Sequence, residues 1–155
     1  MTDHLFHDAK SQDVRLDAQP EPVTIDAAIT AMIVVDMQND FGAAGGMFDQ
    51  AGIDISLIQK AVISTARVLA SARQAGIKIV YLKMAFQPDL SDLGSPDSPN
   101  RVRHLRFGVG QTVRAPNGTD SRVLIRDTWG TDIVSELALK PVMWLSTNIV
   151  SAAST

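Results

Sequence analysis

A carboxylate stands directly after a short run of large apolar residues. Residues 32–35, Met-Ile-Val-Val, are followed by Asp36, further polar residues and then several glycines. Apolar runs of this length and composition are typical of buried strands in a parallel sheet. In open α/β sheets, ligands bind outside the carboxyl ends of the strands. We therefore predict that Asp36 lies where such a sheet presents a catalytic group, and a solvated turn aspartate is the alternative interpretation.

The elements that would position this aspartate follow from the pattern of apolar residues. A first strand is expected over residues 31–36 and a second over residues 77–82. Between them, apolar residues recur at helical spacing. Ser56 is the predicted N-cap, Gln59 completes a capping-box pattern, and Gly76 is expected to end the helix. Strand, helix and strand in this order predict a right-handed βαβ unit.

The remaining segments are shorter or less regular. Residues 42–54 are rich in glycine and small residues and are expected to form a loop. Residues 87–117 contain four prolines, and a loop of this length in a compact domain is usually functional, often a lid. A short third strand is expected over residues 123–125. A further helix is expected over residues 132–139, with Thr131 as its cap.

The bulk composition suits one globular domain, since the chain has 155 residues and 45% of them are hydrophobic. It has 14 basic and 17 acidic residues and no basic run, so we do not expect a nucleic-acid partner. We expect no membrane contact, because no apolar stretch approaches the length of a membrane span. The first residues lack the features of a signal peptide, so a cytoplasmic location is expected. Residues 1–22 are polar and are expected to form an N-terminal arm that is mobile or wraps a partner.

Several segments of the sequence together resemble those of a known family. The segment VVDMQNDF resembles the first-strand signature of the isochorismatase-like hydrolases, also called cysteine hydrolases. Four further segments resemble the ureidoacrylate amidohydrolase branch of that family, which serves pyrimidine catabolism. They are GGMFDQAGIDIS, ARQAGIKIVYLKM, PDLSDLGSPDSPNRVRHLRFGVGQ and LIRDTWGTDIVSEL. The resemblance covers residues 21–141. It implies an α/β fold with three α-β-α layers around a parallel sheet, present here as a partial hydrolase domain over residues 23–141.

The resemblance also implies a reaction and its catalytic groups. Members of the family use an Asp-Lys-Cys arrangement, in which a thiolate attacks a carbonyl carbon after a carboxylate has taken its proton. Asp36 matches that carboxylate, and backbone N–H groups stabilise the oxyanion. The implied reaction cleaves the ureido C–N bond of ureidoacrylate or its peroxy form without a cofactor, and full-length relatives are expected to be homo-oligomers. Biuret hydrolase, N-carbamoylsarcosine amidase and isochorismatase are the alternatives within the family.

Only Asp36 of this arrangement can be matched to the sequence. The chain contains no cysteine, and the lysine of the family belongs to a segment that has no match here. Lys83 ends the second predicted strand but does not match that segment, so we expect it to be a surface or lid-facing lysine. A non-catalytic remnant or binding module is therefore the alternative to an enzyme.

Two aromatic residues are candidates for contacts with the substrate. Phe41 follows the aspartate motif, and Trp129 lies in the RDTWGTD word after the third predicted strand. Either residue could instead be a core aromatic. No metal site is predicted, because the spacing of Asp and His residues that binds a metal in the nicotinamidases has no counterpart in this sequence.

A basic segment surrounds His104 within the long proline-containing loop. Its arginines are Arg101, Arg103 and Arg106. Such a cluster could face a carboxylate substrate or a neighbouring subunit, since Arg is suited to binding carboxylates. A solvated loop with scattered charge is the interpretation that we favour.

Residues 142–155, VMWLSTNIVSAAST, do not continue the α/β pattern. The resembling family has at this place a strand and a lysine-containing segment of the type DVVVYKHRFSGFY. One nucleotide sequence encodes both peptides in two frames, and Met143 and Trp144 restrict it because each has a single codon. We therefore expect that one base is lost after Pro141 and that the tail is a frameshift product. A genuine divergent terminus is the alternative, and the DNA sequence across the Pro141 codon distinguishes the two.

Overall fold

The computed structural model describes residues 12–138 and 145–146. Its central element is a three-stranded parallel sheet, in the order β3 (Ala31–Val35), β4 (Lys78–Leu82) and β7 (Leu145–Ser146). The first two strands confirm the predicted strands at residues 31–36 and 77–82. The parallel sheet agrees with the predicted α/β class.

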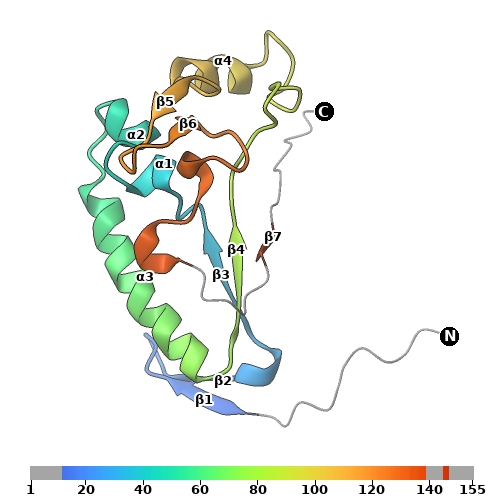
Figure 1. The fold of residues 1–155 in the computed structure, drawn as a ribbon. Coiled ribbons are helices and arrows are strands. Elements are labelled where there is room, and N and C mark those ends of the chain that lie inside the picture. The colour runs from blue at the N-terminus through green and yellow to red at the C-terminus, as the bar shows by residue number, and fades with distance from the viewer. Residues whose placement is uncertain (1–11, 139–144, 147–155) are drawn as a thin grey trace, which may run out of the picture.

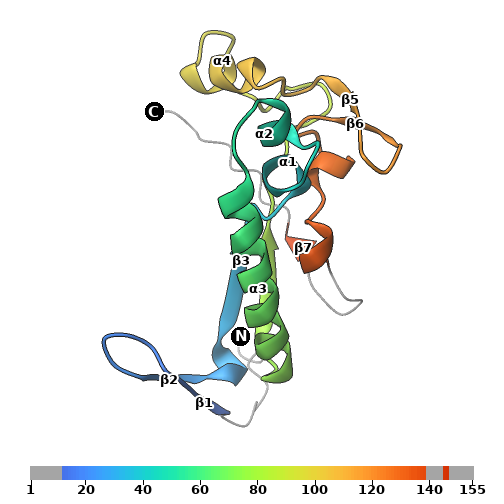
Figure 2. The ribbon, with the colours of Figure 1, turned by 90° about the vertical axis from the view of Figure 1, so that its left-hand side faces the viewer.

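One face of this sheet is covered by the long helix α3 (Ser56–Gln74), which runs along β3 and β4 in both views (Figures 1 and 2). Alternate strand residues turn their side chains toward the helix, as the period of two in a strand requires. Val34, Ile79 and Tyr81 pack there against Val62 and Leu69 of α3. The predicted strand–helix–strand unit is therefore confirmed, and its core lies between α3 and the sheet.

The N-terminal end of α3 differs from the prediction, whereas its C-terminal end agrees with it. Its first residue is Ser56, and Ile55 rather than Ser56 is the N-cap, so the predicted capping box is wrong. The Asp54 carboxylate instead accepts hydrogen bonds from the backbone nitrogen of Ser56 at 2.9 Å and from its hydroxyl at 3.1 Å. At the other end Gly76 has φ +71°, a left-handed conformation that glycine adopts easily, which confirms it as the residue that ends the helix.

The predicted third strand does not form as a strand. Residues 123–125 form a buried turn, with Leu124 at φ +50°, after β6 (Asp120–Arg122). Of the predicted parallel pairing, only an isolated bridge between Ile125 and Phe86, beyond the end of β4, is present. Strand β6 pairs antiparallel with β5 (Thr112–Arg114), away from the central sheet. Residues 123–125 are apolar because they are buried in a second hydrophobic cluster, and not because they form a strand of the central sheet. In that sheet the strand next to β4 is β7.

The predicted helix over residues 132–139 is also wrong for residues 132–138, the part of it that the structure describes. Only a short 3₁₀ turn, η3 (Ser135–Leu137), forms there. Ile133 makes an antiparallel bridge with Gln38, and the backbone nitrogen of Val134 donates to Met37 O at 3.0 Å. These tertiary hydrogen bonds to the chain after β3 replace the bonds that a helix would have made.

Short elements gather beyond the carboxyl ends of β3 and β4 (Figure 1). The segment expected as a loop, residues 42–54, begins at the last residue of α1 (Asn39–Gly42) and contains α2 (Met47–Gln50). The long proline-containing segment contains α4 (Pro99–Arg106) and β5. These elements enclose the second hydrophobic cluster, and we refer to them together with β6 and the turn η2 (Trp129–Thr131) as the cap.

The opposite end of the sheet carries a hairpin of β1 (Asp13–Leu16) and β2 (Val23–Asp26), followed by the turn η1 (Ala27–Ile29) (Figure 1). This hairpin lies mostly in the segment expected as an arm. The rest of that arm, residues 1–11 with His4 and His7, lies outside the described residues, as do residues 139–144 and 147–155 of the chain. In the described part, no helix is both long and apolar enough to cross a membrane.

Candidate active site

Asp36 occupies the first position after β3, at the carboxyl edge of the sheet. Its backbone nitrogen donates to Leu82 O at 3.0 Å. Because Val35 and Leu82 are register partners, Asp36 and Lys83 follow directly from a paired position on adjacent strands. Asp36 has φ +55°, a left-handed conformation that aspartate tolerates better than most residues and that turns the chain out of the strand. Asp36 therefore lies at the edge where the sequence predicts it.

The environment of Asp36 favours a proton acceptor. Its side chain remains open to solvent, yet the surrounding protein removes part of the water from the carboxylate. This partial burial raises the pKa of Asp36 above its usual value of 3.8. A carboxylate with a raised pKa is a stronger base than a freely solvated one, and the change brings the pKa nearer to neutral pH.

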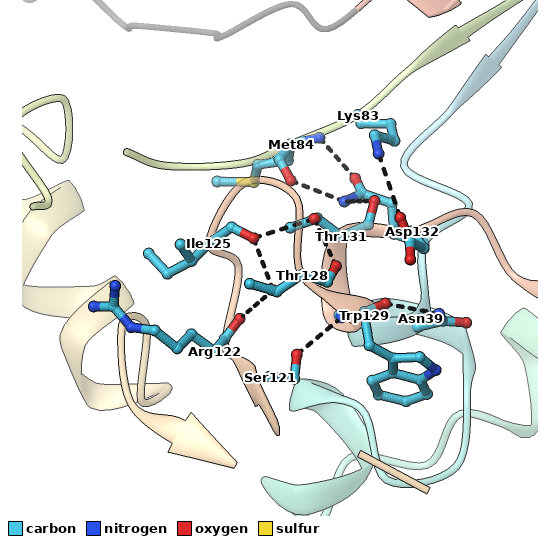
Figure 3. A network of polar contacts seen from close by, with 12 residues as sticks. Asn39, Lys83, Met84, Ser121, Arg122, Ile125, Thr128, Trp129, Thr131 and Asp132 are labelled. Atoms are coloured by element: carbon cyan, nitrogen blue, oxygen red, sulfur yellow. Dashed lines mark hydrogen bonds and ion pairs between the residues drawn. The ribbon is translucent and has the colours of Figure 1, made fainter. Parts of the chain in front are cut away.

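Lys83 is buried, with 9% of its surface exposed, so the expected surface position is wrong; Lys83 instead faces a pocket whose wall includes residues of the long segment expected as a lid. Its Nζ lies 3.9 Å from Oδ1 of Asp132, the contact drawn in Figure 3. The argument that placed Asp36 applies equally to Lys83, since each residue directly follows a parallel strand. The position of Lys83 after the second strand was therefore the signal that could have identified it.

A buried amide connects the two strand ends. Gln38 is completely buried, and its Nε2 donates to Met84 O at 2.9 Å and to Thr131 O at 3.2 Å. Its Oε1 accepts from Met84 N at 2.7 Å. In Figure 3, Met84 of the chain after β4 lies close to Thr131 of the turn η2. Gln38 thereby fixes the segments that carry Asp36, Lys83 and Asp132.

A second buried side chain connects the cap. The carboxylate of Asp40 accepts hydrogen bonds from Met47 N at 3.2 Å and from Leu124 N at 2.7 Å. Burial raises the pKa of Asp40, and these two hydrogen bonds oppose that change. A Cβ atom at residue 130 would collide with this carboxylate, which explains why the RDTWGTD word has Gly130 at that position.

A pocket of about 700 Å³ lies beside Asp36 and Lys83, which both line it. Most of its wall is apolar and comes from the cap. The apolar side chains from the cap and from the end of β4 include Phe41, Met47, Phe48, Met84, Phe107 and Leu124. Phe48 lies between two other rings, with its centroid 5.1 Å from that of Phe41 and 6.4 Å from that of Phe107.

The two aromatic candidates lie in different places. Phe41 lines the pocket, as a substrate-contacting residue must. Trp129 is not among the lining residues, and its backbone oxygen accepts a hydrogen bond from Asn39 Nδ2 at 2.8 Å. In Figure 3 its indole ring lies on the side of the polar network opposite to Lys83. A contact between substrate and either residue stays a prediction.

The residues of the basic segment lie on helix α4, and only some of them line the pocket. Arg103 and His104 line the pocket, whereas Arg101 Nη1 donates to Gly94 O at 3.1 Å outside it. His104 Nδ1 lies 2.8 Å from Asn100 O, and its ring packs edge-on against Phe86 at 5.3 Å. The expected loop is therefore wrong, since the segment is a helix; Arg103 and His104 line the pocket, and Arg103 is also exposed to solvent as expected.

The described residues include no cluster of three His, Cys, Asp or Glu side chains that could hold a metal ion. The pocket can bind a molecule against its apolar wall, and Asp36 can exchange a proton with that molecule. Lys83 lines the same pocket and can stabilise negative charge on that molecule.

Comparison with known proteins places the chain among hydrolases. Residues 30–149 match the family model of the isochorismatase domain. The chain is 38% identical over 128 residues to the ureidoacrylate amidohydrolase RutB of Methylorubrum extorquens, covering 83% of this chain and 50% of that protein. It is 35% identical over 132 residues to the RutB protein of Rhizobium rhizogenes, covering 85% and 52% respectively. The chain thus spans about half the length of the curated relatives that it matches.

The solved structures agree with these relatives. A cysteine hydrolase from Pseudomonas syringae pv. phaseolicola 1448A superimposes with a TM-score of 0.59 at 25% identity, covering 81% of this chain and 48% of that one. An isochorismatase family protein from Desulfovibrio vulgaris superimposes with a TM-score of 0.51 at 23% identity, covering 77% and 52%, which supports the fold alone. The family match continues past Val142 to residue 149, and so includes part of the segment for which we expect a shifted reading frame.

Proposed function

Because the chain belongs to the isochorismatase family, we propose that its pocket is the substrate site of a hydrolase that cleaves an amide C–N bond, and that Asp36 is the proton acceptor there. The observation that carries this proposal is the pair of Asp36 and Lys83 at the carboxyl edge of the sheet, both lining the same pocket. Catalytic groups of open α/β sheets are expected at that edge.

The proposed substrate is ureidoacrylate or its peroxy form, and relatives named ureidoacrylate amidohydrolase support the first of the two. In the complete mechanism Asp36 takes the proton of a thiol, and the thiolate attacks the ureido carbonyl carbon. Breaking the C–N bond then releases aminoacrylate, which takes up a proton, and water releases carbamate from the sulfur. This sequence of 155 residues contains no cysteine. We therefore propose that these residues bind the substrate and do not turn it over.

Binding tests this proposal without requiring turnover. Ureidoacrylate is titrated into the ¹⁵N-labelled chain, and we expect shifts in the amide signals of residues around the pocket, with no release of ammonia. Biuret, N-carbamoylsarcosine and isochorismate are titrated in parallel, since they represent the alternative activities. Tighter binding of one of these compounds would reassign the substrate. Absence of binding by all four compounds at millimolar concentration would contradict a substrate site and favour a non-catalytic remnant.

A further inference from the structure

Of the two cationic side chains that line the pocket, one has an ion-pair partner and the other has none among the described residues. Asp36, Lys83 and Arg103 all line it. Lys83 already has a carboxylate partner in Asp132. Arg103 makes no ion pair with any other residue that the structure describes. The pocket therefore presents one arginine whose charge is available to a bound molecule.

Helix α4 determines where this arginine points. Asn100, Arg103, His104 and Phe107 all line the pocket, and their spacing of three, four and seven places them on one side of a helix. The start of α4 is fixed by Ser98, whose Oγ accepts from Arg101 N at 3.2 Å. Since His104 packs edge-on against Phe86, the same side of the helix is held against the segment that follows β4. Arg103 is thus presented to the pocket by a held helix and not by a loose loop.

His104 also lies on this side of the helix. Its Nδ1 lies 2.8 Å from the carbonyl oxygen of Asn100, to which it can donate a hydrogen bond. Arg103 differs from it because a guanidinium is always charged, so Arg103 is the permanent cation among the α4 residues that line the pocket.

We propose that Arg103, with Asn100 three residues before it on α4, binds the carboxylate of the substrate and so selects acids over neutral amides. This inference rests on the proposed function, since it takes the amide or ureido group to lie at Asp36. A carboxylate close to Asp36 would be repelled by the like charge, so the anionic end of the substrate lies toward α4. The guanidinium is suited to a carboxylate because its N–H groups can donate two parallel hydrogen bonds. The apolar wall between the two ends suits the carbon atoms that join them.

The test compares an acid with its neutral counterpart in matched variants. The probes are N-carbamoyl-β-alanine, which is anionic, and its primary amide, which is not. The variants are Arg103→Gln, Arg103→Lys and Arg106→Gln; Arg106 is a matched control, since it lies on the same helix but does not line this pocket. Each Kd is measured by NMR titration of the full chain, and the spectrum reports in addition whether each variant is folded.

We expect Arg103→Gln to weaken binding of the acid about fivefold, because a partly exposed ion pair is lost. Binding of the neutral amide should change little, Arg103→Lys should retain part of the preference, and Arg106→Gln should retain all of it. The inference is overturned if Arg103→Gln keeps the preference for the acid, if Arg106→Gln loses it equally, or if the wild-type chain binds neither probe.

A third probe separates this inference from the proposed function. Propionate carries the carboxylate without the ureido group. If it binds as tightly as N-carbamoyl-β-alanine and with the same dependence on Arg103, the carboxylate site is supported while the ureido part of the proposed function fails. If the acid binds more tightly than propionate but without dependence on Arg103, the proposed function is supported and the inference fails.

Discussion

The side-chain amide of Gln38 forms two hydrogen bonds with the backbone of Met84, donating to its oxygen at 2.9 Å and accepting from its nitrogen at 2.7 Å. Gln38 follows Asp36 by two residues, and Met84 directly follows Lys83. The bonds therefore hold together the segments that carry the two charged residues at the sheet edge. A third bond, to Thr131 O, attaches the turn η2 to the same point.

Replacing Gln38 with Met should destabilise the chain by about 3 kcal/mol, since a side chain of similar size leaves buried backbone groups of Met84 and Thr131 without a partner. Urea unfolding followed by circular dichroism measures the change. Gln74→Met is the control, because Gln74 is exposed at the end of α3. A loss of stability no larger than that of the control would mean that water replaces the amide.

Gly130→Ala should destabilise the chain by about 2 kcal/mol, because the added Cβ collides with the Asp40 carboxylate. Gly52→Ala is the comparison, since Gly52 has no atom near the added methyl group, although its φ of +74° adds a backbone strain that Gly130 does not have. It should cost about 1 kcal/mol from backbone strain alone. A double variant that also carries Asp40→Ser should recover part of the loss. Additive effects of the two substitutions would contradict the collision.

The raised pKa of Asp36 predicts a pH dependence of stability. A carboxyl group whose folded pKa lies above its unfolded value contributes stability that is fully present below the unfolded pKa and is lost as pH rises through the folded pKa. Asp36→Asn removes this contribution, so the unfolding free energy of the variant relative to wild type should rise as pH rises from about 4. Urea unfolding across the acidic range measures the trend.

Asp89→Asn supplies a control of opposite sign. Hydrogen bonds from Ser91 lower the pKa of Asp89, so its contribution to stability is present above the unfolded pKa and is lost as pH falls through the folded pKa. The unfolding free energy of this variant relative to wild type should therefore fall as pH rises. If both variants showed the same trend, the direction given for Asp36 would be wrong.

The sheet face opposite α3 should bind a hydrophobic dye. Ile33 is 58% exposed and Val35 is 53% exposed within the described residues, and exposed apolar strand surface promotes association. Ile33→Thr should reduce dye binding and the amount of aggregate seen by size-exclusion chromatography. Ile63→Thr, at an equally exposed position on α3, should reduce them less. A monomeric wild-type chain that binds no dye would contradict this prediction.

The frameshift hypothesis predicts the outcome of one insertion. Adding a single G after the Pro141 codon should restore hydrolysis of ureidoacrylate, measured as ammonia or carbamate release, whereas the unmodified chain should release neither. In the repaired enzyme, Asp36→Asn should lower the rate by about 10²–10⁴, since an amide does not accept the thiol proton. Turnover by the unmodified chain, or full activity of the repaired variant, would contradict the role of Asp36.

Local sequence was sufficient for the elements whose pattern and environment agree. The apolar run before Asp36, the helical period of α3 and Gly76 at its end were all predicted correctly, because each depends on side-chain spacing or on one backbone angle. The same spacing placed Asp36 at the carboxyl edge, since a residue that directly follows a parallel strand has little freedom of position. The resemblance to the family likewise depends on short continuous segments of sequence.

Only the tertiary structure decided the remaining features. Residues 123–125 are as apolar as a sheet strand, but their burial comes from the cap, and hydrophobicity alone does not distinguish the two environments. The bonds of Ile133 and Val134 to the chain after β3 join residues almost a hundred positions apart, which no local pattern encodes. Burial of Lys83 and the turn of Arg103 into the pocket likewise depend on distant segments packing over the strand ends. The sequence by itself therefore determined where the carboxylate stands, and the packing of the cap decided which charges surround it.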